Sequence, residues 1–192
     1  VDGVLSSISG YSGGHLKNPK YEDVIYKDSG HVEVIEVTYD PSVVSYKDLL
    51  NVYWKNIDPF DASGQFCDKG KSYRSVIFFE NNSQKELIDK SFKDIEKKFD
   101  KKIVTLVWKF DIFYPAENYH QDYYEKNFIR YLMYKNACKR KETLKKNNNL
   151  NDGIKQTWLF AHPDNKKFTG PYKRFEGMLL GQQYKILLNH SS

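Results

Sequence analysis

Cysteine is scarce in this sequence, whose 192 residues include only Cys67 and Cys138. Two thiols are too few for the disulfide-rich scaffold of a small secreted domain. No apolar run approaches the roughly 20 residues that a membrane-spanning helix needs. The chain also does not open with a basic and then apolar leader. We therefore expect a soluble protein of the reducing cytoplasm.

Residue spacings typical of metal and phosphate sites are also lacking. His15, His31 and His120 are scattered, and no HxxxH or CxxC pair occurs. The string Gly10-Tyr11-Ser12-Gly13-Gly14 fits the G-x-S-x-G pattern of serine hydrolases, but no helix is predicted after it to form the nucleophile elbow. No glycine-rich loop with a following lysine is present either. We expect no bound metal and no bound cofactor.

Positive charge is in mild excess, because 30 lysines and arginines face 25 acidic residues, a net charge of +5. Much of the excess lies in one segment, which we interpret as the solvated face of a helix. Nucleic-acid binding would require a broader basic surface or a known module. We expect a monomer with neither nucleic acid nor a membrane as partner. The basic residues of the segment are Lys135, Lys139, Arg140, Lys141, Lys145 and Lys146, opposed by Glu142.

Hydrophobic residues make up 40% of the chain and aromatic residues 16%, enough for a well-buried core. The β-branched run from His31 to Tyr39 predicts a strand, as do residues 73–80 and 103–110. Capping-box patterns predict helices over 45–56, starting at Ser45, and over 83–99, where Ser83 is followed by Glu86. Strands and helices mixed in this way predict an α+β fold, a two-layer α/β sandwich with a mixed sheet.

The chain changes texture near its end. Residues 1–146 have the regular patterns of a single domain, including a basic and helical segment over 128–146. In residues 147–192 aromatic side chains alternate with glycine, proline and lysine without clear periodicity, and only residues 178–188 could form a helix or strand. We therefore expect one domain over 1–146, followed by an irregular C-terminal extension.

Reactive side chains gather in the loop of residues 65–75, which leads into the hydrophobic run of residues 76–79. Polar groups on a loop held by a rigid strand are a common layout for an active site. Within the loop, Asp68 is a candidate site residue or a turn cap, while its charge would raise the pKa of Cys67 and weaken that thiolate. Cys138 has basic neighbours that favour a thiolate, so it is a candidate redox thiol or simply an exposed cysteine.

A glutamate and two tyrosines are further candidates. Glu33 interrupts a β-branched strand, where an exposed face could carry it in water. If Glu33 is buried instead, desolvation would raise its pKa and let it hold a proton near neutral pH. Tyr11 and Tyr73 are two of fifteen tyrosines, so each could be a core residue or a hydrogen-bond donor in a site.

Six segments in fixed order carry a family resemblance. The segments are Gly10-Tyr11-Ser12-Gly13-Gly14, Asn18-Pro19-x-Tyr21-x-x-Val24, Gly30-His31-Val32-Glu33, Tyr39-Asp40-Pro41, Asp68-x-Gly70-x-x-Tyr73-Arg74-Ser75 and Phe113-Tyr114-x-Ala116-Glu117-x-x-His120-Gln121. Through them the chain resembles, over residues 1 to about 146, the A-type peptide-methionine sulfoxide reductases.

The resemblance implies a reaction and a role for four residues. Such enzymes reduce the S epimer of methionine sulfoxide, free or in oxidised proteins, and so repair them. A cysteine thiolate attacks the sulfoxide sulfur while the oxygen is protonated. By resemblance, Glu33 is the proton donor, and Tyr11 and Tyr73 hydrogen-bond the sulfoxide oxygen. Asp68 completes this polar pocket, and thioredoxin is the expected electron donor.

The thiols depart from the family pattern. The family nucleophile lies in a Gly-Cys-Phe-Trp segment before the equivalent of Val4, and no residue of this sequence matches it. Cys138 occupies a position where many members have Cys-Gly-Arg-Asp, here replaced by Cys-Lys-Arg-Lys. Two interpretations follow: a reductase whose short N-terminal piece is lost or supplied elsewhere, or a non-catalytic remnant that still binds sulfoxides.

Overall fold

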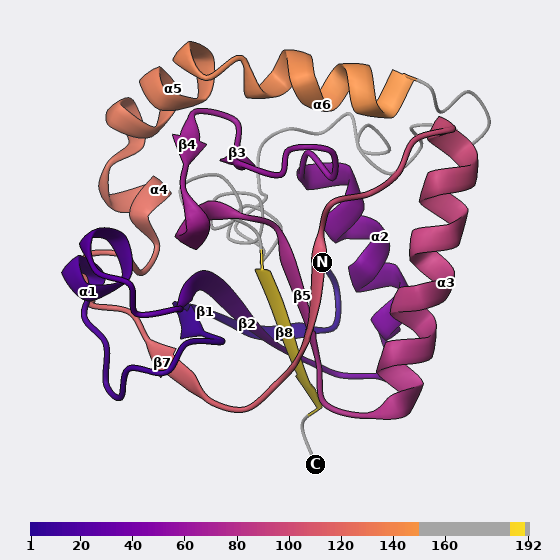
Figure 1. Cartoon of the computed structure of the whole chain (residues 1–192), viewed down its shortest axis with the longest axis horizontal. Helices are drawn as coiled ribbons and strands as arrows, with labels where there is room; N and C mark the ends of the chain where they lie inside the picture. The colour runs from indigo at the N-terminus through magenta and orange to yellow at the C-terminus, as the bar shows by residue number, and fades with distance from the viewer. Residues whose placement is uncertain (150–184, 191–192) are drawn as a thin grey trace.

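The computed structural model describes residues 1–149 and 185–190, and within them the chain forms one mixed six-stranded sheet (Figure 1). The strand order is β6-β5-β8-β2-β1-β7. β1 is antiparallel to β2 and β7, whereas β8 is parallel to both β2 and β5, and β5 is parallel to β6. The strands are β1 (Val4–Ser12), β2 (Val32–Tyr39), β5 (Val76–Phe79), β6 (Leu106–Lys109), β7 (Phe113–Pro115) and β8 (Lys185–His190), and a separate hairpin joins β3 (Gly64–Gln65) to β4 (Asp68–Lys69).

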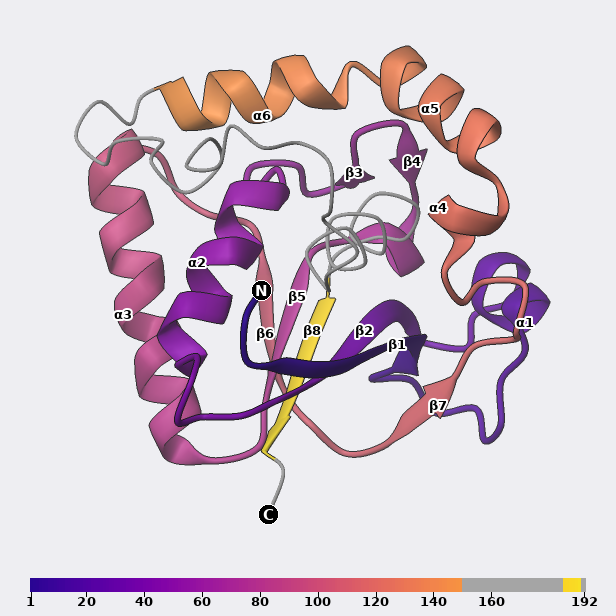
Figure 2. The same ribbon diagram turned by 180° about the vertical axis from the view of Figure 1, so that it is seen from behind.

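Helices lie beside the sheet and across one end of it. α2 and α3 run side by side, and α5 and α6 follow each other over the end where the β3–β4 hairpin lies (Figures 1 and 2). This arrangement confirms the predicted α+β fold with a mixed sheet. The helices are α1 (Tyr21–Tyr26), α2 (Tyr46–Asn56), α3 (Asn82–Phe99), α4 (Tyr123–Lys126), α5 (Phe128–Ala137) and α6 (Arg140–Asn149), with a 3₁₀ turn, η1, at Lys71–Tyr73.

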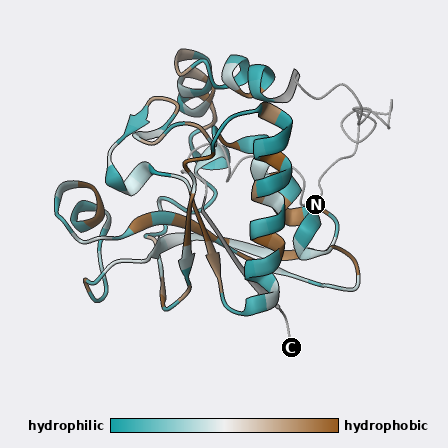
Figure 3. Ribbon diagram, turned by 45° about the vertical axis from the view of Figure 1, so that its right-hand side comes forward, coloured by the Kyte–Doolittle hydropathy of each residue, from teal (hydrophilic) through white to brown (hydrophobic). Residues whose placement is uncertain are grey.

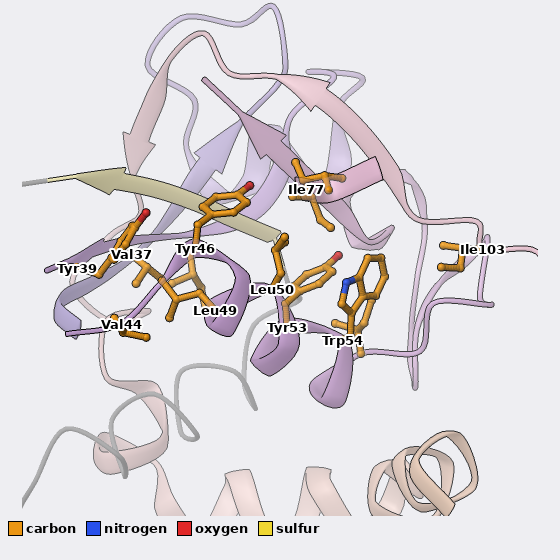
Figure 4. Close-up of a cluster of buried hydrophobic side chains, with 13 residues drawn as sticks. Val37, Tyr39, Val44, Tyr46, Leu49, Leu50, Tyr53, Trp54, Ile77 and Ile103 are labelled. Atoms are coloured by element: carbon orange, nitrogen blue, oxygen red, sulfur yellow. The ribbon is translucent and has the colours of Figure 1, made fainter. Parts of the chain in front are cut away.

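The main hydrophobic core lies between the sheet and the helices α2 and α3. Leu49, Leu50 and Tyr53 of α2 are at most 1% exposed, as is Ile77 of β5. Burying one such side chain contributes about 1.5–3 kcal/mol. In Figure 3 the central strands are mostly hydrophobic, whereas the outward side of α3 is hydrophilic. The cluster, drawn in Figure 4, contains Ile35, Val37, Tyr39, Val44, Tyr46, Leu49, Leu50, Tyr53, Trp54, Ile57, Ile77, Ile88 and Ile103.

The opposite face of the sheet is covered too. Val32 and Val34 of β2 and Phe78 of β5 form a second buried cluster, against which Trp108 and Phe113 pack. Strands buried on both faces have continuous apolar runs rather than strict alternation. This explains why five of the eight residues of β2 are apolar, and it makes the one acidic residue in its buried first half, Glu33, more unusual.

The predicted N-cap residue is confirmed for α2 and is wrong for α3. Ser45 caps α2 as predicted, since its hydroxyl accepts a hydrogen bond from the backbone N–H of Asp48. The carboxylate of Asp48 in turn accepts one from the backbone N–H of Ser45. The predicted cap Ser83 of α3 is wrong, because α3 begins at Asn82. The Asn81 side chain accepts the N–H of Gln84 at 2.9 Å and provides the cap instead. Asparagine at the N-cap is at least as favourable as serine.

The structure also defines the ends of β1, β7 and the helices α5 and α6. β1 continues through Tyr11 of the glycine-rich string to Ser12, and the chain turns only at Gly13, where φ is +81°. The segment from Phe113 forms β7, which pairs with β1. The single predicted helical segment 128–146 is two helices, separated at Lys139 by a φ of +47°.

The C-terminal region contributes one strand to the sheet. β8, from within the predicted extension 147–192, lies between β5 and β2 and pairs with both. The rest of that extension beyond residue 149 lies outside the described residues, so the boundary at 146 stays a prediction. In the described part of the chain, no helix is long and apolar enough to cross a membrane.

Candidate functional site

Strand register brings two predicted site residues together. In the β1–β2 ladder Tyr11 lies directly opposite Glu33, so their side chains share one face of the sheet. Tyr11 is 2% exposed and Glu33 is 7% exposed. The sequence left open whether Glu33 is exposed or buried, and the structure shows that it is buried. It lies near the start of β2, which continues into the main core.

Tyr11 makes a hydrogen bond to a carboxylate that the sequence did not single out as a site residue. Its hydroxyl donates to Glu117 Oε2 at 2.8 Å, and the backbone N–H of Tyr21 donates to Glu117 Oε1 at 2.9 Å. Burial raises the pKa of Tyr11, and the hydrogen bond to Glu117 raises it further. Burial alone would raise the pKa of Glu117, but these hydrogen bonds, one from its own backbone and the charge of His120 together lower that pKa. The hydroxyl of Tyr11 is thus protonated and donated to Glu117.

A glutamine fixes the segment that carries Glu117. The Gln121 side chain donates to the carbonyl of Ser9 at 2.9 Å and to that of Ala116 at 3.0 Å, and it accepts the N–H of Ser9 at 3.0 Å. His120 lies beside it with its ring 4.6 Å from that of Tyr21. Burial lowers the pKa of His120, although the charge of Glu117 opposes this. The segment after β7 is therefore held on the edge of β1.

The loop that precedes β5 is organised by a buried glutamine. Gln65, 0% exposed, accepts the N–H of Asp58 at 2.8 Å and donates to the Asp58 carbonyl at 2.8 Å. The β3–β4 hairpin then turns at Phe66 and Cys67, and Phe66 adopts a left-handed φ of +50°. The sequence predicted only a loop here. The hairpin could not be predicted because strands of two residues are too short to show a periodic pattern.

Tyr73, Tyr21 and Glu33 belong to one electrostatic cluster. Burial raises the pKa of Tyr73, and the charges of Glu33 and then Tyr21 raise it further. Burial and the Glu33 charge also raise the pKa of Tyr21, while its interaction with Tyr73 lowers it. The charge of Asp68 acts on both tyrosines. All four predicted site residues, Tyr11, Glu33, Asp68 and Tyr73, thus border one polar cluster that also contains Tyr21 and Glu117.

The two cysteines form a disulfide with each other. Cys67, in the hairpin turn, and Cys138, the C-cap of α5, have Cα atoms 5.2 Å apart although 71 residues separate them in sequence. That Cα separation is ordinary for a disulfide. The sequence treated the two as separate thiols, and nothing in their spacing signals the pair. Next to it, the Tyr134 hydroxyl donates a hydrogen bond to Asp68 Oδ2.

The interpretation of the basic segment as a solvated helical face is wrong at Arg140, which is buried. It is 4% exposed, its Nη2 donates to the carbonyl of Asn56 at 2.9 Å, and its guanidinium lies 5.1 Å from the centre of the Phe66 ring. A guanidinium can be buried in this way because a carbonyl and an aromatic face replace part of its hydration.

His31 is a structural residue of the glycine-rich turn. Its Nδ1 accepts the N–H of Gly14 at 3.2 Å, so its Nε2 carries the proton and donates to the carbonyl of Leu16 at 2.7 Å. A Cβ at Gly14 would lie 2.3 Å from the backbone nitrogen of His31, which leaves room for glycine only. In the described residues no group of three or more His, Cys, Asp or Glu side chains could hold a metal ion.

An open cavity of about 490 Å³ lies elsewhere, on the far side of the glycine-rich turn. Its lining includes Gly13, Lys85, Trp108 and Asp111, and none of the four predicted site residues. The chemistry-bearing side chains therefore form a compact polar cluster that is separate from this cavity.

Comparison with known proteins places the chain in a family. The family model described as peptide methionine sulfoxide reductase matches residues 1–152. The chain is 49% identical over 140 residues to the peptide methionine sulfoxide reductase MsrA of Listeria monocytogenes, covering 72% of this chain and 79% of that protein.

Solved structures give the same answer. Mxr1 from Saccharomyces cerevisiae in its reduced form matches with a TM-score of 0.61 and 31% identity, over 66% of this chain and 73% of that one. The methionine sulfoxide reductase A of Corynebacterium diphtheriae matches with a TM-score of 0.57 and 27% identity, over 65% of each chain. The chain described here belongs to the peptide methionine sulfoxide reductase family.

Proposed function

We propose that this chain handles the oxygen of a methionine S-sulfoxide during its reduction to methionine. Glu33 donates the proton to the departing oxygen, and Tyr73 donates a hydrogen bond to it. Tyr11 donates a second hydrogen bond when its hydroxyl turns from Glu117 to the ligand. Asp68 forms the wall of the same pocket. The observation that carries the proposal is the cross-strand pair of Tyr11 and Glu33, buried together beside Tyr73. A buried carboxyl and protonated phenols suit a group whose negative charge develops during the reaction.

The reaction balances with one attacking thiol and one dithiol. The thiolate sulfur attacks the sulfoxide, the sulfur–oxygen bond of the substrate breaks, and the oxygen leaves on the thiol as a sulfenic acid. The methionine thioether is released. One thiol of a dithiol such as thioredoxin then displaces water from the sulfenic acid, and its second thiol resolves the mixed disulfide and frees the attacking thiol. In this scheme Glu33 supplies the proton that the oxygen needs in the first step.

The attacking thiol is the open part of the scheme. The 192 residues contain two cysteines, and these are joined to each other. We propose that neither acts as the nucleophile, and that a Gly-Cys-Phe-Trp segment outside these residues supplies it. The alternative is a non-catalytic module that binds sulfoxides through the same tyrosines. Thioredoxin as donor, oxidised proteins or free methionine sulfoxide as substrate, a cytoplasmic location and a monomeric state belong to the same proposal.

Turnover measurements separate these functions. The 192-residue chain, mixed with thioredoxin, its reductase and a methionine S-sulfoxide, should show no reduction. The same chain with a Gly-Cys-Phe-Trp segment joined before Val1 should turn over, and Glu33→Gln should abolish that activity. Glu36→Gln, in the same strand but with its side chain on the opposite face, is the matched control and should retain it.

Three results would contradict parts of the proposal. Robust turnover by the 192-residue chain would make Cys67 or Cys138 the nucleophile. An unchanged rate for Glu33→Gln would remove Glu33 as the acid. Stereospecific binding of the S-sulfoxide without turnover in the extended chain would favour the binding module.

A further inference from the structure

The turn of the β3–β4 hairpin is held by the helices α5 and α6 at three successive residues. Phe66 lies under the guanidinium of Arg140, 5.1 Å from it. Cys67 is bonded to Cys138, and the carboxylate of Asp68 accepts the hydroxyl of Tyr134. We call these three contacts the hairpin clamp.

Helix geometry pairs two of these contacts. Tyr134 and Cys138 are one turn apart in α5, and the N–H of Cys138 donates to the Tyr134 carbonyl at 3.0 Å. Residues at this spacing lie on one face of a helix. Their partners, Cys67 and Asp68, are neighbours in the hairpin. A bond between the sulfurs therefore brings the Tyr134 hydroxyl and the Asp68 carboxylate into register, and the hydrogen bond in turn holds the two sulfurs close.

We propose that Tyr134 is a positioning residue for the Asp68 carboxylate and that the Cys67–Cys138 disulfide locks this contact reversibly. The inference rests on the proposed function in one respect, namely that Asp68 belongs to the sulfoxide pocket. The lock itself depends only on the hairpin clamp. Asp68 is thereby fixed from outside the pocket, by a helix that contributes none of the four predicted site residues.

The disulfide can be opened by a dithiol. Cys67 is an exposed residue, and we expect an attacking thiolate to reach its sulfur from solvent. Attack there forms a mixed disulfide and releases the Cys138 thiol. The second thiol of the reductant then displaces Cys67, so two electrons and two protons pass to the protein and the reductant leaves as its own disulfide. After reduction, the hydrogen bond from Tyr134 remains available but no covalent bond enforces it.

The first test uses the chain itself and no substrate. The disulfide is equilibrated with reduced and oxidised dithiothreitol, and free thiols are counted after acid quench. Tyr134→Phe should shift the equilibrium about threefold to tenfold toward the thiols, at most about 30 mV for a two-electron couple. Tyr26→Phe, a change at a tyrosine that is 79% exposed, is the control and should leave it unchanged.

A double-mutant cycle tests the contact. If Tyr134 acts through Asp68, then Asp68→Ala should shift the same equilibrium and the double variant should shift it no further than either single variant. An equilibrium unchanged within twofold in Tyr134→Phe, or strictly additive shifts, would overturn the proposal.

The second test asks whether the clamp matters to the pocket. Binding of a methionine S-sulfoxide and of methionine is compared by NMR titration in oxidised and in phosphine-reduced protein. Tyr134→Phe should weaken binding of the sulfoxide more than that of methionine, and the difference should be larger in the reduced protein. Equal weakening of both ligands would make Tyr134 merely structural. If the unaltered chain does not prefer the sulfoxide to methionine, the proposed function fails, while the dithiothreitol equilibrium still decides the lock.

Discussion

The hydrogen bond between Tyr11 and Glu117 should be an important stabilising contact of the site. Glu117 accepts two hydrogen bonds, from the Tyr11 hydroxyl and from the backbone N–H of Tyr21. A hydrogen bond to a charged acceptor contributes about 1.5–3 kcal/mol, against about 0.5–1.5 kcal/mol between neutral groups. Tyr11→Phe removes one charged bond and should therefore lower the free energy of unfolding by about 1.5–3 kcal/mol.

Glu117→Gln changes the same contact from the other side. The amide oxygen of the new glutamine can still accept the hydrogen bond from the backbone N–H of Tyr21. Its amide nitrogen then donates a hydrogen bond to the Tyr11 oxygen. Two hydrogen bonds to a charged acceptor become two between neutral groups, so the expected loss is about 2–3 kcal/mol. Because Tyr11 now accepts, its own proton is released for a ligand oxygen. Glu117→Gln should thus destabilise the protein while leaving the Tyr11 hydroxyl better able to bind a sulfoxide.

Urea unfolding, followed by circular dichroism at neutral pH with the disulfide intact, measures these losses. The double variant should lose clearly less than the sum of the two single variants, since both act on one bond. Tyr26→Phe is the exposed control and should stay within about 0.5 kcal/mol of the parent. Additive losses, or a loss below about 0.5 kcal/mol in Tyr11→Phe, would refute the reasoning.

Three further predictions concern stability. Replacing Cys67 and Cys138 together by serine should cost up to about 4 kcal/mol in urea unfolding, because their disulfide spans 71 residues. Leu49→Ala should cost about 2–5 kcal/mol in the same assay, since the side chain is 0% exposed in the main core. The lowered pKa of His120 means that the unfolded chain takes up its proton first, so stability should fall as pH drops below 6.5. Unfolding curves across this range should show a smaller fall for His120→Phe.

Local patterns explain what could be predicted from the sequence. The β-branched run of β2 and the Ser45 cap of α2 act within a few residues, and both appear where expected. The resemblance also identified Tyr11 and Glu33, whose pairing then followed from the strand register. These features depend on short-range geometry and on motifs that can be compared directly.

Long-range contacts explain what could not be predicted. The disulfide joins residues 71 apart, and the burial of Arg140 depends on a carbonyl of Asn56 and a ring at Phe66. The insertion of β8 between β5 and β2 is likewise set by pairing across the whole chain. Tyr134 is an ordinary helical tyrosine in the sequence, and its contact with Asp68 becomes visible only once α5 lies over the hairpin.

The central claim is that Tyr11 and Tyr73 bind the oxygen of a methionine S-sulfoxide. It is tested most directly by titrating the S-sulfoxide, the R-sulfoxide and methionine into protein with ¹³C-labelled tyrosine rings, with signals assigned through Tyr11→Phe and Tyr73→Phe. The account predicts that the S-sulfoxide moves the Tyr11 and Tyr73 signals and that methionine and the R-sulfoxide do not. Equal shifts with all three ligands, or none with the S-sulfoxide, would contradict it.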